Sequence, residues 1–326
     1  MVPTESSNGS GNLFALYRDM VRIRLAEERL AALFADGAVP GFIHLSIGQE
    51  AVAVGVVSAL NPDDTVASNH RGHGHALAKG LDLSAFYLEL LGKDEGLCRG
   101  RGGSMHVADL SKGMLGANGI VGAGMSIAVG SALAHKSLAN GQVAVVFFGD
   151  GALGEGLLHE SINLAKILGL PVLFVCENNG WSEFSATSEQ ISFNLESLAA
   201  GYGLSYSCVA GNDVRKVANA AGKQVAEIRA HSAPSVLECK TLRVRGHFEG
   251  DAQKYRTMDG AEVDDHDPLL VAARALRAEG VSDEDLAEAR RLVDIEIGQA
   301  VEDAKKGSPP SFADALIDVY AQQAGA

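Results

Sequence analysis

Two clusters of polar residues follow apolar runs in the middle of the chain and could together bind a metal ion. Asp150 lies in a glycine turn directly after the apolar run 143–148, and Asn179 follows the next run, 172–176. A carboxylate and an amide oxygen are ligands that magnesium accepts, and this ion commonly shares its coordination with substrate phosphates. Glycines in the turn, such as Gly151, let the backbone approach a ligand closely. These residue types predict a site for magnesium and a diphosphate.

The segments around the two clusters have the pattern of a strand–helix–strand crossover. Residues 143–148 and 172–176 are short, apolar and rich in β-branched side chains, which is typical of strands buried on both faces. Between them, apolar residues recur at threes and fours from Leu157 to Leu168, which predicts a helix that begins near Glu155. Strands joined in this way lie parallel, so both polar clusters are expected at the carboxyl edge of one sheet, where open α/β sheets bind ligands.

The segment GDGALG, residues 149–154, also fits the glycine pattern of dinucleotide-binding proteins. Two features argue against a nicotinamide cofactor. Asp150 would repel a pyrophosphate that carried no metal ion, and the acidic residue expected about 20 positions further on is missing. The dinucleotide site therefore remains the weaker alternative.

Composition and charge exclude several classes of protein. The 326 residues carry a net charge of −14, which argues against binding to nucleic acid or to an anionic membrane. No run of about 18 apolar residues predicts a membrane span, and the start of the chain lacks the features of a signal peptide. Residues 1–12 are expected to be disordered. Four cysteines without a C-x-x-C pair fit a reducing compartment, so a cytoplasmic location is expected.

Several segments resemble, in order, the alpha subunit of the thiamine diphosphate-dependent decarboxylating component of 2-oxo acid dehydrogenase complexes. The resemblance covers about residues 13–270 and includes the glycine turn, the helix after it and the Asn-Asn ending of the second strand. The other matching segments are GFIHLSIGQEA (41–51), HRGHGHALAKG (70–80), GRGGSMHVADLSKGMLGANGIVGA (100–123) and GHFEGDAQKYR (246–256). Within this family, GHFEGDAQ and LSKGMLGANGIVGAG are most similar to acetoin dehydrogenase alpha subunits.

The fold implied by the resemblance, and by the alternation of strand and helix patterns, is α/β. It is a doubly wound, mostly parallel sheet of the thiamine diphosphate-binding type with a C-terminal helical extension. Residues 13–266 would form the cofactor-binding domain, opened by a helix over 13–36, and residues 267–326 the extension. The glycine-rich segment 92–124 is aperiodic and is expected to serve the site.

The resemblance also implies roles for individual positions around the cofactor. Arg71 would hold the diphosphate with His70 beside it, a task that suits the planar fork of donors on arginine. His247 would lie next to the diphosphate and near the reacting 2-oxo acid or lipoyl group. The backbone at Gly119 and Val121 would reach the aminopyrimidine ring.

The resemblance places the metal ligands at the two polar clusters. Asp150, Asn179 and the backbone carbonyl of Trp181 would bind Mg²⁺. Gly151 and Ala152, at the start of the crossover helix, would contact the cofactor.

The histidines allow more than one interpretation. His44 is either a core histidine with satisfied hydrogen bonds or, as the resemblance implies, a catalytic residue at the channel leading to the cofactor. His70, His73 and His75 are close enough in sequence to suggest metal ligands, but no carboxylate or cysteine accompanies them. His73 could orient the loop, and His75 is expected to be structural.

The basic stretch 243–256 is either a solvated charged loop or, by resemblance, a segment that orders over the bound cofactor. Two residues depart from the family pattern. Arg245 replaces the first histidine of a common H-G-H sequence, and Phe248 stands where mitochondrial pyruvate enzymes carry a phosphorylated serine. Phosphorylation at that position is therefore excluded. Arg245 leaves the identity of the substrate undecided.

The resemblance finally implies partners and a reaction. A glutamate needed to activate the cofactor would come from a beta subunit, so the chain is expected to act in an α2β2 heterotetramer. The small-molecule substrate would be acetoin, with pyruvate or a branched-chain 2-oxo acid as alternatives. The two-carbon unit would pass to the lipoyl domain of a dihydrolipoyl acyltransferase. A lipoyl-independent carboligase, which joins that unit to a second carbonyl compound, is a further alternative.

Overall fold

The structure is a computed structural model that describes residues 9–317. Residues 1–8, part of the segment expected to be disordered, and residues 318–326, the end of the expected helical extension, lie outside the described chain. No helix within 9–317 has the length and apolarity needed to cross a membrane.

A six-stranded parallel sheet forms the centre of the described chain, with the strand order β2-β1-β3-β4-β8-β7. Its strands are β1 (Thr65–Ala67), β2 (Met114–Gly116), β3 (Ala144–Gly149), β4 (Val172–Asn178), β7 (Ser205–Ala210) and β8 (Ser235–Lys240). β3 and β4 pair in parallel from Ala144 opposite Val172 to Gly149 opposite Glu177. The predicted crossover and α/β fold class are thus confirmed, and both polar clusters follow strands that end at the same edge.

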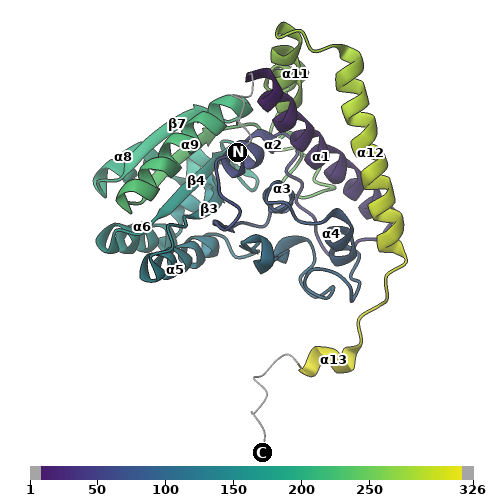
Figure 1. The fold of residues 1–326 in the computed structure, drawn as a ribbon, viewed down its shortest axis with the longest axis horizontal. Coiled ribbons are helices and arrows are strands. Elements are labelled where there is room, and N and C mark those ends of the chain that lie inside the picture. Colours follow the sequence, from purple (N-terminus) through teal and green to yellow (C-terminus); the bar gives the residue numbers. More distant parts are fainter. Residues whose placement is uncertain (1–8, 318–326) are drawn as a thin grey trace, which may run out of the picture.

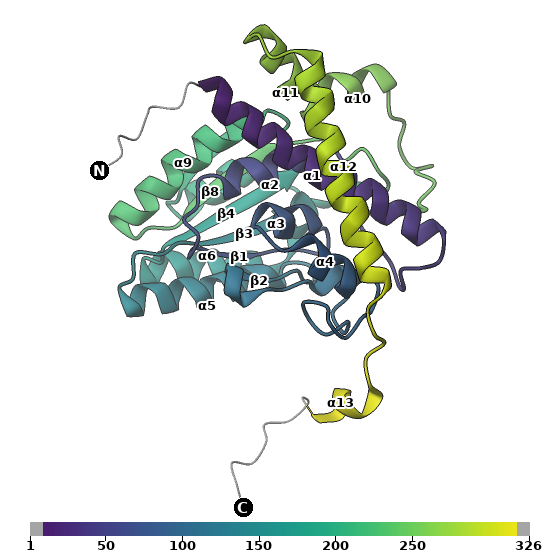
Figure 2. The same ribbon diagram turned by 45° about the vertical axis from the view of Figure 1, so that its right-hand side comes forward.

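Helices cover both faces of the sheet because alternate strand residues point to opposite sides. On one face, Val146, Phe148 and Phe174 pack with α5 (Ala123–Leu138), α6 (Gly156–Leu168) and α8 (Leu195–Gly201). Val145 and Leu173 point to the other face. The helices of that face are α1 (Gly9–Ala35), α2 (Glu50–Val57), α3 (His73–Ala78), α4 (Leu83–Leu90) and α9 (Val214–His231). Figures 1 and 2 show α5 and α6 on one side of the strands, with α1, α2 and α9 on the other.

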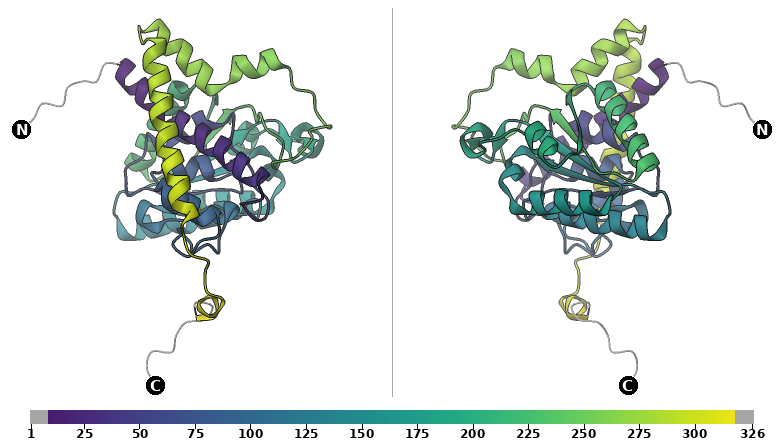
Figure 3. Two further views of the ribbon diagram at one scale, coloured as in Figure 1. Left: turned by 90° about the vertical axis from the view of Figure 1, so that its right-hand side faces the viewer. Right: turned by 90° about the vertical axis from the view of Figure 1, so that its left-hand side faces the viewer.

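The C-terminal helices extend the second face. They are α10 (Gly260–His266), α11 (Pro268–Ala278), α12 (Asp283–Lys305) and α13 (Phe312–Ile317). α12 runs along α1 and reaches α4, and Leu276, Val293 and Ile297 are buried in the same apolar core as the sheet. The short α13 lies away from the sheet (Figure 3).

Four details differ from the sequence predictions. α1 begins at Gly9, so residues 9–12 are helical rather than disordered. The segment 92–124 contains β2, which is too short to show periodicity and is held by a bond from Val66 N to Gly113 O (2.8 Å). It also contains two short 3₁₀ turns, Ser104–His106 and Leu110–Lys112.

The other two differences lie beside the polar clusters. The expected loop at 181–188 is a hairpin of β5 (Trp181–Ser182) and β6 (Ser185–Ala186), followed by α7 (Thr187–Gln190). A 3₁₀ turn, Asp150–Gly154, precedes α6. These elements are two to five residues long, and elements this short produce no hydrophobic period in a sequence.

Candidate cofactor site

A cavity of about 440 Å³ lies at the carboxyl ends of β1, β3 and β4. Segment 119–122, Arg243 and His247 are part of its lining. The predicted site residues that line it are His44, His70, Arg71, Gly119, Val121, Gly151, Ala152, Asn179, Trp181 and His247. The fold therefore brings together residues that are spread over 200 positions of the chain.

Asp150 is fully buried directly behind the cavity wall. One carboxylate oxygen accepts a hydrogen bond from Asn179 N (3.2 Å), and the other accepts one from the hydroxyl of Thr187. Burial raises the pKa of Asp150, and these hydrogen bonds lower it only partly. Within residues 9–317 no basic side chain forms an ion pair with this carboxylate. A buried carboxylate without a cationic partner fits a bound divalent cation.

The Asn179 side chain is fixed in orientation next to Asp150. Its amide nitrogen donates to Gln49 Oε1 (3.1 Å), and its Oδ1 accepts from Trp181 N (3.1 Å). The amide oxygen and the carboxylate thus belong to one rigid group of oxygen atoms. Gln49 and Thr187 were not singled out from the sequence, because only the fold brings them to this group.

Two glycines allow this close arrangement. A Cβ atom on Gly151 would lie 2.7 Å from Ser182 Oγ, so the turn after β3 packs directly on the hairpin that carries Trp181. Gly48 has a φ of +97°, and a Cβ atom there would lie 2.4 Å from Leu242 O. Only glycine fits at Gly48, which fixes the segment that carries His44 and Gln49.

Two buried arginines face the cavity. Arg71 donates to Leu45 O (2.5 Å) and His247 O (2.9 Å), and Arg243 donates to Tyr255 Oη (3.0 Å). Burial, followed by the nearby charge of Arg243, lowers the pKa of Arg71 to about 9. Arg243 is 1% exposed, and its Nε has no hydrogen-bond partner among the described residues. Two confined positive charges that form no ion pair with a carboxylate of residues 9–317 predict an anionic ligand such as a diphosphate.

Arg243 is a site residue that the sequence interpretation missed. It was included only in the basic stretch 243–256. The interpretation of this stretch as a solvated loop is wrong, because Arg243 is buried and hydrogen bonds within the stretch order it. Asp251 accepts from His247 N (2.8 Å) and from Tyr255 Oη (2.7 Å), and Arg256 donates to Arg243 O (2.8 Å). The signal for Arg243 was a basic residue three positions after the end of β8, on the same edge of the sheet as the other site residues.

His44, His70 and His247 form a cluster at the cavity. Their ring centroids are 4.8 to 5.3 Å apart, and each offers a nitrogen within 4.8 Å of the others. Burial, followed by the charge of Arg71, lowers the pKa of His44 to about 3 and that of His247 to about 4. Two adjacent arginines and the lack of a carboxylate in the cluster disfavour a divalent cation. Neutral imidazoles in this place suit hydrogen bonding to a polar substrate.

His44 is not a satisfied core histidine, because its Nδ1 is buried and unpartnered within the described chain. The alternative metal site of His70, His73 and His75 is also contradicted. His73 bonds Glu27 Oε2 (2.9 Å) and Ser104 Oγ (2.9 Å), whereas His75 bonds Ser68 Oγ (2.7 Å) and stacks on Phe147. Both are structural residues of α3.

These histidines predict how stability depends on pH. The folded chain holds them neutral, so below about pH 6.5 the unfolded chain binds more protons than the folded one. The free energy of unfolding should therefore fall as the pH falls from about 6.5 towards 4. Denaturant titrations across this range would measure it. The fall should be smaller in His44→Gln/His247→Gln than in the unchanged chain, and equal slopes would contradict the assignment.

The fold and this site define the class of protein. The chain matches the dehydrogenase E1 component family over residues 18–312 and belongs to it. Membership of this family implies thiamine diphosphate as the cofactor.

Three relatives show which enzymes of this family the chain is similar to. The chain is 47% identical over 316 residues to the alpha subunit of acetoin:2,6-dichlorophenolindophenol oxidoreductase of Cupriavidus necator, covering 94% of each chain. It is 44% identical to the protein of the same name from Bacillus subtilis, covering 94% of this chain and 92% of the other. The alpha subunit of the pyruvate dehydrogenase E1 component of Zymomonas mobilis is 39% identical, with 92% and 86% covered.

Proposed function

We propose that this chain is the cytoplasmic alpha subunit of a thiamine diphosphate-dependent acetoin dehydrogenase. It acts in an α2β2 heterotetramer with a beta subunit and passes a two-carbon unit to the lipoyl domain of a dihydrolipoyl acyltransferase. The observation that carries the proposal is the buried carboxylate of Asp150, which lacks a cationic partner among the described residues, beside a cavity lined by Arg71 and Arg243. The names of the two relatives above 40% identity favour acetoin.

The residues present fit the cofactor and its metal ion. Asp150, Asn179 and the carbonyl of Trp181 would hold Mg²⁺. Arg71 and Arg243 match a diphosphate in charge, with His70 and His247 beside them. Gly119 and Val121 offer backbone to the aminopyrimidine, and Gly151 and Ala152 lie in the turn before α6, where the helix dipole favours phosphate.

When bound, the cofactor supplies the carbanion that attacks a carbonyl and the electron sink for the carbon–carbon bond that breaks. The chain supplies positioned hydrogen bonds. His247 Nδ1 lies 3.3 Å from Arg243 Nη1, which can only donate, so the imidazole proton is on Nε2. His247 can thus donate from Nε2 to a substrate oxygen.

The mouth of the cavity has the character of a subunit contact. Ile120 and Val121 line it and are 69% and 43% exposed, and Phe42 and Phe184 nearby are 63% and 44% exposed. Such apolar surface around a functional cavity supports a partner that covers it. We place the beta subunit there, where it would bring the glutamate that activates the cofactor.

The substrate test uses the chain coexpressed with its beta subunit and supplied with a lipoyl domain. Acetoin, pyruvate and a branched-chain 2-oxo acid are compared by kcat/KM. We expect acetoin to exceed the other two by about ten-fold or more, the scale on which pockets discriminate small apolar groups. Preference for pyruvate or the branched acid would assign the chain to those enzymes instead. Condensation products formed equally well without the lipoyl domain would favour the carboligase.

A further inference from the structure

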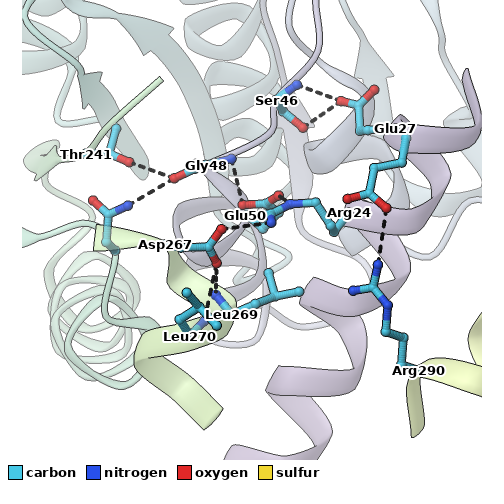
Figure 4. Close-up of polar contacts among 12 residues, drawn as sticks. Arg24, Glu27, Ser46, Gly48, Glu50, Thr241, Asp267, Leu269, Leu270 and Arg290 are labelled. Atoms are coloured by element: carbon cyan, nitrogen blue, oxygen red, sulfur yellow. Dashed lines mark hydrogen bonds and ion pairs between the residues drawn. The ribbon is translucent and has the colours of Figure 1, made fainter. Parts of the chain in front are cut away.

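We propose that Asp267, Arg24 and Glu50 form a mostly buried positioning chain through which the C-terminal helices hold segment 46–50 against the proposed magnesium ligand Asn179. The inference rests on the proposed function and deepens it, because it assigns a role in the cofactor site to residues that do not line the cavity. Figure 4 shows these residues between α1, α2 and α11.

The first link is made by Asp267, the N-cap residue of α11. One carboxylate oxygen caps the helix by accepting from Leu269 N (2.8 Å) and Leu270 N (3.2 Å). The other accepts from Arg24 Nη1 (2.8 Å), in the middle of α1. A single carboxylate thus fixes the start of α11 and also holds the guanidinium of Arg24.

The second link joins Arg24 to Glu50, the first residue of α2. Arg24 Nε donates to Glu50 Oε1 (2.5 Å), and the Glu50 side chain is 0% exposed. Burial raises the pKa of Glu50, while Arg24 lowers it. Burial alone would lower the pKa of Arg24, but the carboxylates of Glu50 and Asp267 raise it above its usual value. Arg24 is therefore a cation shared between two carboxylates.

The third link passes from Glu50 to the cofactor side. Glu50 Oε2 accepts from Gly48 N (2.9 Å), and Gly48 O accepts from Asn212 Nδ2 (3.0 Å) and Thr241 Oγ1 (3.3 Å). The next residue, Gln49, accepts from Asn179 Nδ2 (3.1 Å). Displacement of Gly48 would thus move the acceptor that orients the Asn179 amide.

The other end of the segment is held by the same helix. Glu27, one turn after Arg24 on α1, accepts from Ser46 N (2.7 Å) and Ser46 Oγ (2.7 Å). Figure 4 shows the contacts of Glu27 with Ser46 and of Glu50 with Gly48. α1 therefore fixes the segment at two points, and Asp267 sets the position of one of them.

A buried chain of charges is a costly way to stabilise a fold, since well-packed apolar residues often stabilise as much or more. Ion pairs of this kind fix the orientation of the groups that they join, because a guanidinium and a carboxylate bind each other in a defined geometry. This orientation is important here because the side-chain oxygen of Gln49 must point towards the amide nitrogen of Asn179.

Asp267→Asn tests the chain with little disturbance to α11. Asparagine caps helices about as well as aspartate, so the cap is kept while the acceptor for Arg24 is lost. In the complex with the beta subunit, we expect magnesium-dependent affinity for thiamine diphosphate to fall about ten-fold, as for other residues that orient metal ligands. Asp82→Asn is the matched control, because Asp82 caps α4 through Ala85 N (2.9 Å) and forms no ion pair within the described chain. Its affinity should be unchanged.

A second readout does not require turnover. Trp181 is the only tryptophan of the chain and lies in the cavity wall. With 5-fluorotryptophan incorporated into this chain only, the ¹⁹F resonance of Trp181 should shift in Asp267→Asn, and not in Asp82→Asn, before any cofactor is added. A higher KM for the cofactor with little change in kcat at saturation should accompany the shift.

Arg24→Lys is the second variant, since lysine cannot hold both carboxylates. Its control is Arg29→Lys on the same helix, where the exposed pair with Asp294 (3.4 Å) contributes little. Loss of thermal stability in Asp267→Asn and Arg24→Lys with unchanged cofactor affinity and ¹⁹F resonance would overturn the inference and leave the proposed function intact. Failure of the unchanged complex to bind the cofactor would overturn both.

Discussion

Replacing Asp150 with alanine is expected to abolish magnesium-dependent binding of thiamine diphosphate and to stop turnover. The carboxylate is the charged member of the proposed metal ligands, and it is buried without a basic ion-pair partner in the described chain. A metal ion of this kind stabilises the transition state by several kcal/mol, so its loss should lower the rate by roughly a thousand-fold or more. Calorimetric titration of the cofactor into the complex with the beta subunit, with and without magnesium, measures the effect.

The Asp150→Ala variant should still fold. Asn179 N and the Thr187 hydroxyl lose their acceptor, at about 1 kcal/mol each. Removal of a carboxylate that is costly to bury offsets this loss.

Thr187→Val is the matched control for Asp150→Ala. It removes the hydroxyl that donates to Asp150 and so frees a carboxylate oxygen, and it should bind the cofactor at least as well as the unchanged chain. Magnesium-dependent binding that survives in Asp150→Ala would place the metal ion elsewhere. The assignment of Asn179 and Trp181 would then be withdrawn too.

The purified chain without a partner is expected to turn over neither acetoin nor pyruvate, although it carries the proposed ligands for magnesium and diphosphate. The physical reason is that the glutamate that activates the cofactor belongs to the proposed beta subunit. A positioned acid or base contributes about 10²- to 10⁴-fold to a rate. Addition of the beta subunit should therefore raise turnover by at least about a hundred-fold, as measured by acetaldehyde release from acetoin and carbon dioxide release from pyruvate.

An inactive beta subunit provides the control for this second prediction. A beta subunit whose activating glutamate is replaced by glutamine should assemble with the chain, as measured by light scattering, without restoring turnover. Activity of this chain on its own would contradict the subunit assignment. Activity of the complex with the altered beta subunit would place the activating group in this chain.

The central part of the fold could be predicted from local patterns. The runs 143–148 and 172–176 are apolar along their whole length, and the helix between them has a clear period, so β3, β4 and α6 were determined by their own residues. Parallel pairing of two strands joined by a helix then follows from chain geometry. Asp150 and Asn179 come together because each follows directly on one of these strands.

The resemblance extended this prediction to residues with no local signal. His44, His70, Arg71 and His247 were assigned by motif, and the structure brings them to one cavity. Their protonation could not be predicted in this way. The low pKa values of His44 and His247 arise from burial and from the charge of Arg71, which reaches them only in the folded chain.

The sequence by itself thus determined the class of fold and the edge of the sheet where Asp150 and Asn179, the proposed oxygen ligands, come together. The tertiary structure alone decided which side chains contact one another at the site and behind it: Thr187 with Asp150, Gln49 with Asn179, and Asp267 with Arg24. The reason is the distance along the chain. Arg24 and Asp267 are 243 residues apart, and no periodicity or turn rule couples residues at that separation. Such contacts exist only because α1 and α11 pack on the same face of the sheet.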